Sequence, residues 1–203
     1  MAHAKQLRRQ QAHNQRDHAA QAYEMDRLCA KQLVILLGDE DFPTTSAAYE
    51  TLLAQGKPAL DALIDGMNHS SGKVRASCAL LMDHLGDDRC IEPLSRILKT
   101  DPLEAVRRCA LHSLACQNCK VSPLQADIIP LILDAALSDR SKQVRRRAVQ
   151  YLVGQNPDQR VVEAMHILIS QSDDSSLVER AERARAWHAQ PHDSVPNCVR
   201  QAP

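Results

Sequence analysis

Aromatic residues are scarce in this sequence: Phe, Trp and Tyr together make up 2% of its 203 residues. A hydrophobic core must therefore be built from aliphatic side chains, and Leu, Ala and Met among them are good helix formers. The same scarcity leaves few rings on which nucleic acid bases could stack. The composition thus favours many small contacts between helices and argues against a binder of single-stranded nucleic acid.

Net charge and long apolar runs are also missing. Lys plus Arg equals Asp plus Glu at 25 each, so bulk charge attracts neither nucleic acid nor an anionic membrane. The longest apolar runs, such as residues 33–37 and 128–133, are far too short to cross a bilayer, and no apolar signal segment follows the first residues. We therefore expect no membrane partner and a cytoplasmic location.

Motifs of established catalytic chemistry are missing as well. The sequence contains no nucleophile elbow, phosphate-binding loop, dinucleotide-binding glycine pattern or zinc-protease motif. Its nine histidines are scattered along the chain. The sequence therefore predicts a protein that is not an enzyme, with no catalytic residue, no cofactor and no metal ligand set.

Cysteines are present in an odd number, seven, and most lie inside helical patterns, which is typical of buried thiols in a reducing compartment. Cys116 and Cys119 are the one pair with the spacing of metal ligands. A structural zinc site needs four ligands, and the sequence offers only Cys109 and His112 nearby, on the preceding predicted helix. No predicted strand precedes the pair, as a thioredoxin-type redox unit would require. A redox or metal role for the pair stays open.

A repeated pattern occupies the middle of the chain. Equivalent positions recur at intervals of 32, 38 and 34 residues, as Val74, Val106, Val144 and Val178. Apolar residues follow each valine with the spacing of one helix face, and a second apolar stretch lies 12 to 14 residues upstream. The repeat unit is therefore a pair of helices, and its length is that of helical repeats that stack.

These spacings predict an all-α fold, an α-solenoid of stacked antiparallel helix pairs. No window shows the alternation with a period of two that indicates a strand. We expect a polar tail at residues 1–20, an irregular helical pair at 21–56, four repeats at 57–187 and a disordered tail at 188–203.

The repeat resembles that of the HEAT family, in which an aspartate precedes a Val-Arg dipeptide by five residues and a proline lies in the preceding helix. Two copies match in full, with Pro93, Asp101, Val106 and Arg107 in one and Pro130, Asp139, Val144 and Arg145 in the next. The first copy lacks the aspartate and the fourth lacks the arginine. The resemblance implies a right-handed superhelix. It also implies a ladder in which aspartates pair with arginines of adjacent repeats: Asp101, Asp139 and Asp173 with Arg75, Arg107 and Arg145.

The resemblance further implies a non-enzymatic protein-binding or scaffold module. We expect a partner protein or peptide to lie in the groove lined by the second helices, against these residues: Arg75, Ala79, Arg107, Leu111, His112, Arg145, Val149 and Gln150. Within this set, Ala79, Leu111 and Val149 are predicted to form an apolar strip that is open to a peptide.

Two alternatives remain open from the sequence. A stripe of basic residues could bind phosphate groups of nucleic acid: Lys73, Arg108, Lys142, Arg146 and Arg147. Proteins of HEAT-like architecture also include lyases and DNA glycosylases, so the chain could be such an enzyme or its accessory subunit, with a ligand held in the same groove. A carboxylate or histidine that points into the groove beside Trp187 would favour this alternative. The His-Glu dipeptides of HEAT-like di-iron hydroxylases do not occur here.

Overall fold

The computed structural model of the protein describes residues 25–190. This part of the chain is helical and contains no strand, which confirms the predicted all-α class. Its helices are α2 (Ala30–Leu36), α3 (Phe42–Gln55), α4 (Leu60–Gly66), α5 (Gly72–Asp83), α6 (Ile91–Thr100), α7 (Glu104–Ala115), α8 (Ile129–Ser138), α9 (Lys142–Leu152), α10 (Gln159–Gln171) and α11 (Ser175–His188), with 3-10 turns at Lys57–Ala59 and Asp88–Cys90. None of the helices in this range is long and apolar enough to span a membrane. The predicted tail at 1–20 and the last residues of the other predicted tail, 191–203, lie outside the described range.

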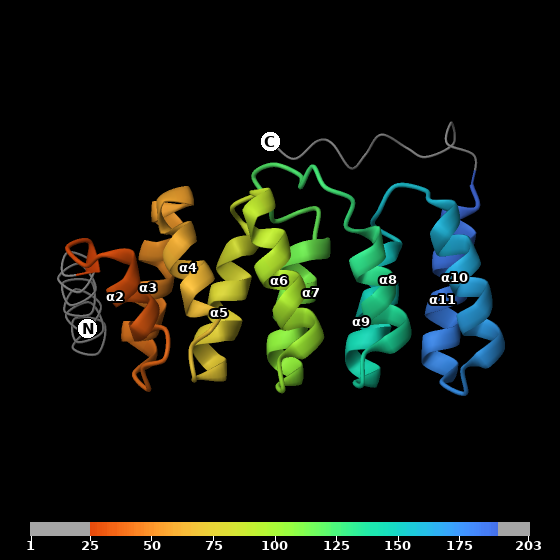
Figure 1. Ribbon diagram of the computed structural model, residues 1–203, viewed down its shortest axis with the longest axis horizontal. Coiled ribbons are helices and arrows are strands. Elements are labelled where there is room, and N and C mark those ends of the chain that lie inside the picture. The colour runs from red at the N-terminus through yellow and green to blue at the C-terminus, as the bar shows by residue number, and fades with distance from the viewer. Residues whose placement is uncertain (1–24, 191–203) are drawn as a thin grey trace, which may run out of the picture.

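The helices pack in successive pairs along the long axis of the molecule (Figure 1). After the pair of α2 and α3, the first helices α4, α6, α8 and α10 pack against the second helices α5, α7, α9 and α11. The second helices also contact one another in chain order, and α6, α8 and α10 do the same in their own layer. A second helix such as α7 therefore has packed neighbours on three sides and turns only a narrow strip to solvent.

Local chemistry explains where individual helices begin and end. Asp41 caps α3 by accepting a hydrogen bond from the backbone N–H of Thr44 (3.0 Å), and Pro43 lies in the first turn, where its missing N–H costs nothing. The helix ends at Gly56, whose positive φ of 62° suits a residue without a side chain. Residues at its own ends therefore set the length of α3.

The core is aliphatic throughout, as the lack of aromatics predicts. Each second helix buries a stripe that begins at the repeated apolar position, and Val74, Val106 and Val144 are at most 1% exposed. Gly66, inside α4, permits close packing, since a Cβ there would lie 2.6 Å from the Cys78 sulfur on α5 and 2.7 Å from the Val34 side chain on α2. The small side chains let neighbouring helices approach closely.

The last pair departs from the sequence prediction in two places. Leu177, not Val178, takes the buried position at the start of α11. The predicted tail was also expected to begin at residue 188, but His188 is the last residue of α11 and is 4% exposed. Its ring Nδ1 accepts from the Asp158 N–H (3.0 Å), and its Nε2 lies 2.8 Å from the Leu152 carbonyl oxygen. The ring fills the end of the core, which no apolar pattern revealed.

Candidate functional site

Arginine and aspartate side chains link neighbouring pairs at the turns between first and second helices. Arg75 on α5 donates to Asp101 (Nε to Oδ2, 2.6 Å; Nη2 to Oδ1, 3.0 Å), and Arg107 on α7 donates to Asp139 (2.9 and 3.0 Å). Burial opposes the ionisation of Asp101, but hydrogen bonds from Arg75 and the Leu103 amide outweigh it, so the pKa of this carboxyl is lowered. Two of the three predicted ladder pairs are therefore present.

The same arginines also bind carbonyl oxygens of their own turns. Arg75 Nη1 donates to the carbonyl oxygen of His69 (2.9 Å), Arg107 Nη1 to that of Asp101 (3.0 Å) and Arg145 Nη1 to that of Asp139 (2.7 Å). Arg107 is 2% exposed. All three arginines were predicted to contact a partner, but Arg75 and Arg107 use all three of their side-chain nitrogens within the fold, and Arg145 uses Nη1 there.

The third predicted ladder pair is wrong. Asp173 is exposed, and Arg146 instead donates to Asp174 (Nε to Oδ2, 3.0 Å; Nη2 to Oδ1, 2.7 Å). The reason lies in the turn. Asp101 and Asp139 stand at the C-terminal caps of α6 and α8, whereas α10 ends in Ser172, which has no charge. The carboxylate comes two residues later from the N-cap of α11, where the arginine one residue further along α9 reaches it.

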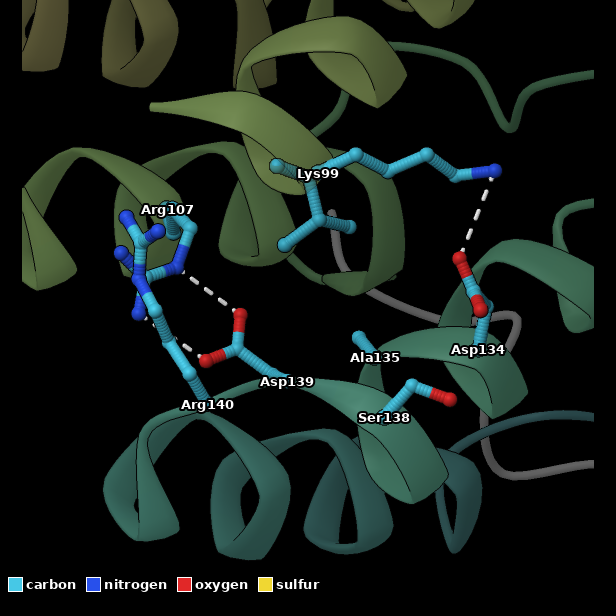
Figure 2. Close-up of a pocket in the computed structure, with 8 residues that line it drawn as sticks. Lys99, Arg107, Asp134, Ala135, Ser138, Asp139 and Arg140 are labelled. Carbon is cyan, nitrogen blue, oxygen red and sulfur yellow. Dashed lines mark hydrogen bonds and ion pairs between the residues drawn. The ribbon is translucent and has the colours of Figure 1, made fainter. Parts of the chain in front are cut away.

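A hollow of about 360 Å³ lies beside the ladder between α6 and α8 (Figure 2). Figure 2 shows the Arg107–Asp139 pair at one end, while Lys99 and Asp134 form an ion pair at the other (3.3 Å). Arg140, also in its wall, donates to the Asp101 carbonyl oxygen (2.6 Å). Since the charged groups in its wall pair with the protein itself, this hollow offers little to a charged ligand.

The predicted apolar strip is wrong. Ala79, Leu111 and Val149 are each 0% exposed and belong to the core. These residues follow the repeated valines by five positions, which places them toward the next second helix, because α5, α7 and α9 pack directly on one another. His112 is half-buried and Gln150 is exposed. Apart from the arginines, these two are therefore the predicted partner-binding residues that reach the surface.

Arginines gather in a different hollow on the second helices. Its volume is about 250 Å³, and its walls come from α7, α9 and α11: Arg108, Gln143, Arg146, Arg147, Gln150 and Arg180. Arg147 donates to Gln150 Oε1 (3.1 Å) and lies over the Tyr151 ring, with 5.3 Å from its Cζ to the ring centroid. We call this feature the arginine hollow. It brings together Arg108, Arg146 and Arg147 of the predicted basic stripe, while Lys73 and Lys142 lie outside it.

Trp187 and the neighbouring histidine are both occupied by backbone contacts. The indole Nε1 of Trp187 donates to the Gln155 carbonyl oxygen (2.9 Å), and the ring is half-buried. His188 is buried and bonded through both ring nitrogens, as described above. The neighbouring His188 is therefore not free to act on a ligand, as a lyase or glycosylase site beside Trp187 would require.

Cys116 and Cys119 meet two side chains in space. One is His112, which the sequence offered as a neighbour, and the other is Asp83 at the end of α5. Contact with the Cys116 thiol, together with burial, raises the pKa of Cys119 to about 12, whereas redox-active Cys-X-X-Cys pairs have a lowered thiol pKa. The sequence missed Asp83, whose only signal was a carboxylate at the end of an otherwise apolar helix face.

Comparisons with known proteins add little to this geometry. No family model matches the chain, and no curated protein matches it. Among solved structures, the chain is similar to the crystal structure of an engineered protein, with 18% identity, a TM-score of 0.46 and 78% of each chain covered. Function must therefore be inferred from the residues of the chain itself.

Proposed function

We propose that this protein is a non-enzymatic binding module, an α-solenoid of HEAT-like repeats with a right-handed superhelix, which holds an acidic segment of another protein in the arginine hollow. Two layers of paired helices and the recurring Arg–Asp links support the architecture. Free cysteines in the described part of the chain fit the cytoplasmic location that we also propose. The observation that carries the function is the meeting of four arginines from three successive second helices in one hollow.

The four arginines of the hollow differ in whether a carboxylate of the protein pairs with them. Arg146 is paired with Asp174, and Arg108 has a long contact with Glu104 (3.9 Å). Arg147 and Arg180 form no ion pair with a carboxylate within residues 25–190, and both contact the uncharged Gln150. A guanidinium group binds a carboxylate through two parallel hydrogen bonds, so glutamate or aspartate side chains of a partner suit this hollow.

The limited extent of the basic surface favours a peptide over nucleic acid. Beyond the hollow, Lys73 on α5 is held by the Asp39 carbonyl oxygen, and Glu179 and Arg183 of α11 pair with each other (3.2 Å). Nucleic acid binding rests on many phosphate contacts along a continuous track of positive charge. A single hollow in a chain of zero net charge matches a short acidic segment better.

The test uses a fluorescent glutamate-rich peptide and a duplex DNA of similar charge as probes. Arg147→Glu combined with Arg180→Glu should weaken peptide binding by about 10-fold or more for each lost charge-assisted contact. Arg183→Glu, on the same helix but outside the hollow, is the matched control and should bind as the original chain does. Tighter binding of the DNA than of the peptide would assign the hollow to nucleic acid, and unchanged binding in the double variant would refute the proposal.

A further inference from the structure

Four side chains that can bind a transition metal meet where the ends of α5 and α7 face the loop after α7. Asp83 ends α5, His112 lies in the last turn of α7, Cys116 follows that helix, and Cys119 lies three residues further on. One ligand atom of each lies within 4.8 Å of the others. We propose that these residues form a site for one structural zinc ion, outside the arginine hollow.

Three of the six separations between ligand atoms can be compared with a tetrahedral site, and all six are within 4.8 Å. Zinc bonds of ~2.3 Å to sulfur and ~2.0–2.2 Å to nitrogen or oxygen give tetrahedral edges of roughly 3.8 Å for S–S, 3.6 Å for S–N and 3.4 Å for N–O. The corresponding separations here are 3.4 Å between the cysteine sulfurs, 3.9 Å from Cys119 Sγ to His112 Nε2 and 2.9 Å from that nitrogen to Asp83 Oδ2. Each differs from its edge by about 0.5 Å or less, which small side-chain rotations can absorb.

The carboxylate of Asp83 is buried inside the cluster, where a metal ion could reach it. The residue is 1% exposed, and its Oδ1 accepts a hydrogen bond from Lys120 Nζ (2.9 Å). Its Oδ2 lies 2.9 Å from His112 Nε2, in a geometry too poor for a hydrogen bond within the described residues. A zinc ion between these two atoms would bind both, whereas without one the buried oxygen depends on its contact with the imidazole.

Surrounding groups hold the ligands in orientation. His112 Nδ1 lies 2.6 Å from the hydroxyl oxygen of Tyr151 on α9, and with Nδ1–H donating there, the lone pair of Nε2 remains free for the metal. Lys120, whose side chain is 3% exposed, bridges Asp83 and the Cys116 carbonyl oxygen. Zinc binding replaces the two thiol protons, and the charges of two thiolates, one carboxylate and one ammonium are then balanced by the divalent ion.

A disulfide accounts for fewer of these features. It requires a sulfur–sulfur distance of about 2.05 Å and uses neither Asp83 nor His112. A zinc ion uses all four side chains and ties the loop of residues 116–128 to the end of α5. Four protein ligands leave no open position for water or substrate, which is typical of structural and not catalytic zinc.

The experiment measures zinc in reduced protein that has been purified without a metal-binding tag. The metal is removed with a chelator, and zinc is titrated back against a chromophoric chelator. Cys119→Ser removes a ligand in the loop, and Cys109→Ser changes a half-buried α7 cysteine outside the cluster as the matched control. Tyr151→Phe removes the partner of His112 without removing a ligand, and should weaken zinc binding by about 10-fold or more.

We expect one zinc per chain in the original protein and in Cys109→Ser, with a higher melting temperature when zinc is bound, and neither effect in Cys119→Ser. Cobalt in place of zinc should give the visible absorption of a tetrahedral site with thiolate ligands. This spectrum needs no variant, so it remains decisive if Cys119→Ser does not fold. A reduced original chain that binds no stoichiometric zinc, or equal zinc in the two cysteine variants, would overturn the proposal.

Discussion

Arg146 of α9 donates two hydrogen bonds to Asp174, the N-cap residue of α11, while Arg145 beside it donates to the carbonyl oxygen of Asp139 in its own turn. In the two preceding pairs, the residue directly after the repeated valine makes the link to the next aspartate. In the link to the last pair, both partners lie one residue later in the sequence than the pattern predicts, at Arg146 and Asp174. This displacement shows that the link between pairs survives even where the sequence pattern is lost.

Asp174 should matter more for stability than its neighbour Asp173. The Asp174 carboxylate accepts from the Leu177 amide and from Arg146, so it both caps α11 and joins it to α9. Asp173 is exposed. We expect Asp174→Ala to lower the melting temperature measured by circular dichroism clearly more than Asp173→Ala. Equal effects of the two variants would show that the displaced pair contributes nothing.

Leu111 should behave as a core residue and not as part of a binding surface. It is 0% exposed between α7 and its neighbours, so Leu111→Ala is expected to reduce the free energy of unfolding by about 2–5 kcal/mol. Leu137→Ala, at a position 46% exposed on α8, is the matched control and should change it by about 0.5 kcal/mol or less. Urea unfolding measures the free energy of unfolding of both variants. An effect of Leu111→Ala as small as that of Leu137→Ala would indicate that Leu111 lies at the surface, as the predicted apolar strip requires.

His188 should make stability depend on pH near neutrality. Burial lowers its pKa from the ordinary 6.5, although the Leu152 carbonyl and the Asp158 charge act in the opposite direction. The unfolded chain then binds this proton at a higher pH than the folded chain does. The contribution of the neutral His188 ring to the free energy of unfolding is therefore fully present above pH 6.5. It is lost as the pH falls toward the lower pKa that His188 has in the folded chain.

The check is urea unfolding above and below pH 6.5 for the original chain and for His188→Gln, which cannot titrate. The original chain should lose more free energy of unfolding on acidification, because protonation of Nδ1 breaks its bond with the Asp158 N–H. Parallel pH profiles for the two proteins would exclude His188 as the cause.

The sequence by itself determined the helices and their pairing. These features depend on short-range spacing, because apolar residues that recur every three or four positions define a helix face wherever the helix lies. Asp101 and Asp139 stand five residues before Val106 and Val144, and their pairing with arginines of adjacent pairs was what the resemblance to HEAT repeats implied. In the fourth copy the predicted buried position, Val178, is wrong by one residue, because Leu177 beside it is the residue that is buried.

Tertiary structure alone decided which polar and apolar residues meet or reach the surface. The buried face of α7 is wider than one helical stripe because three neighbouring helices surround it, so Leu111 is covered. Asp83 meets Cys119 across 36 positions of sequence because α5 and α7 pack together and the following loop turns back over them. Local periodicity records the direction in which a side chain points from its own helix. What it meets there depends on how the neighbouring helices pack.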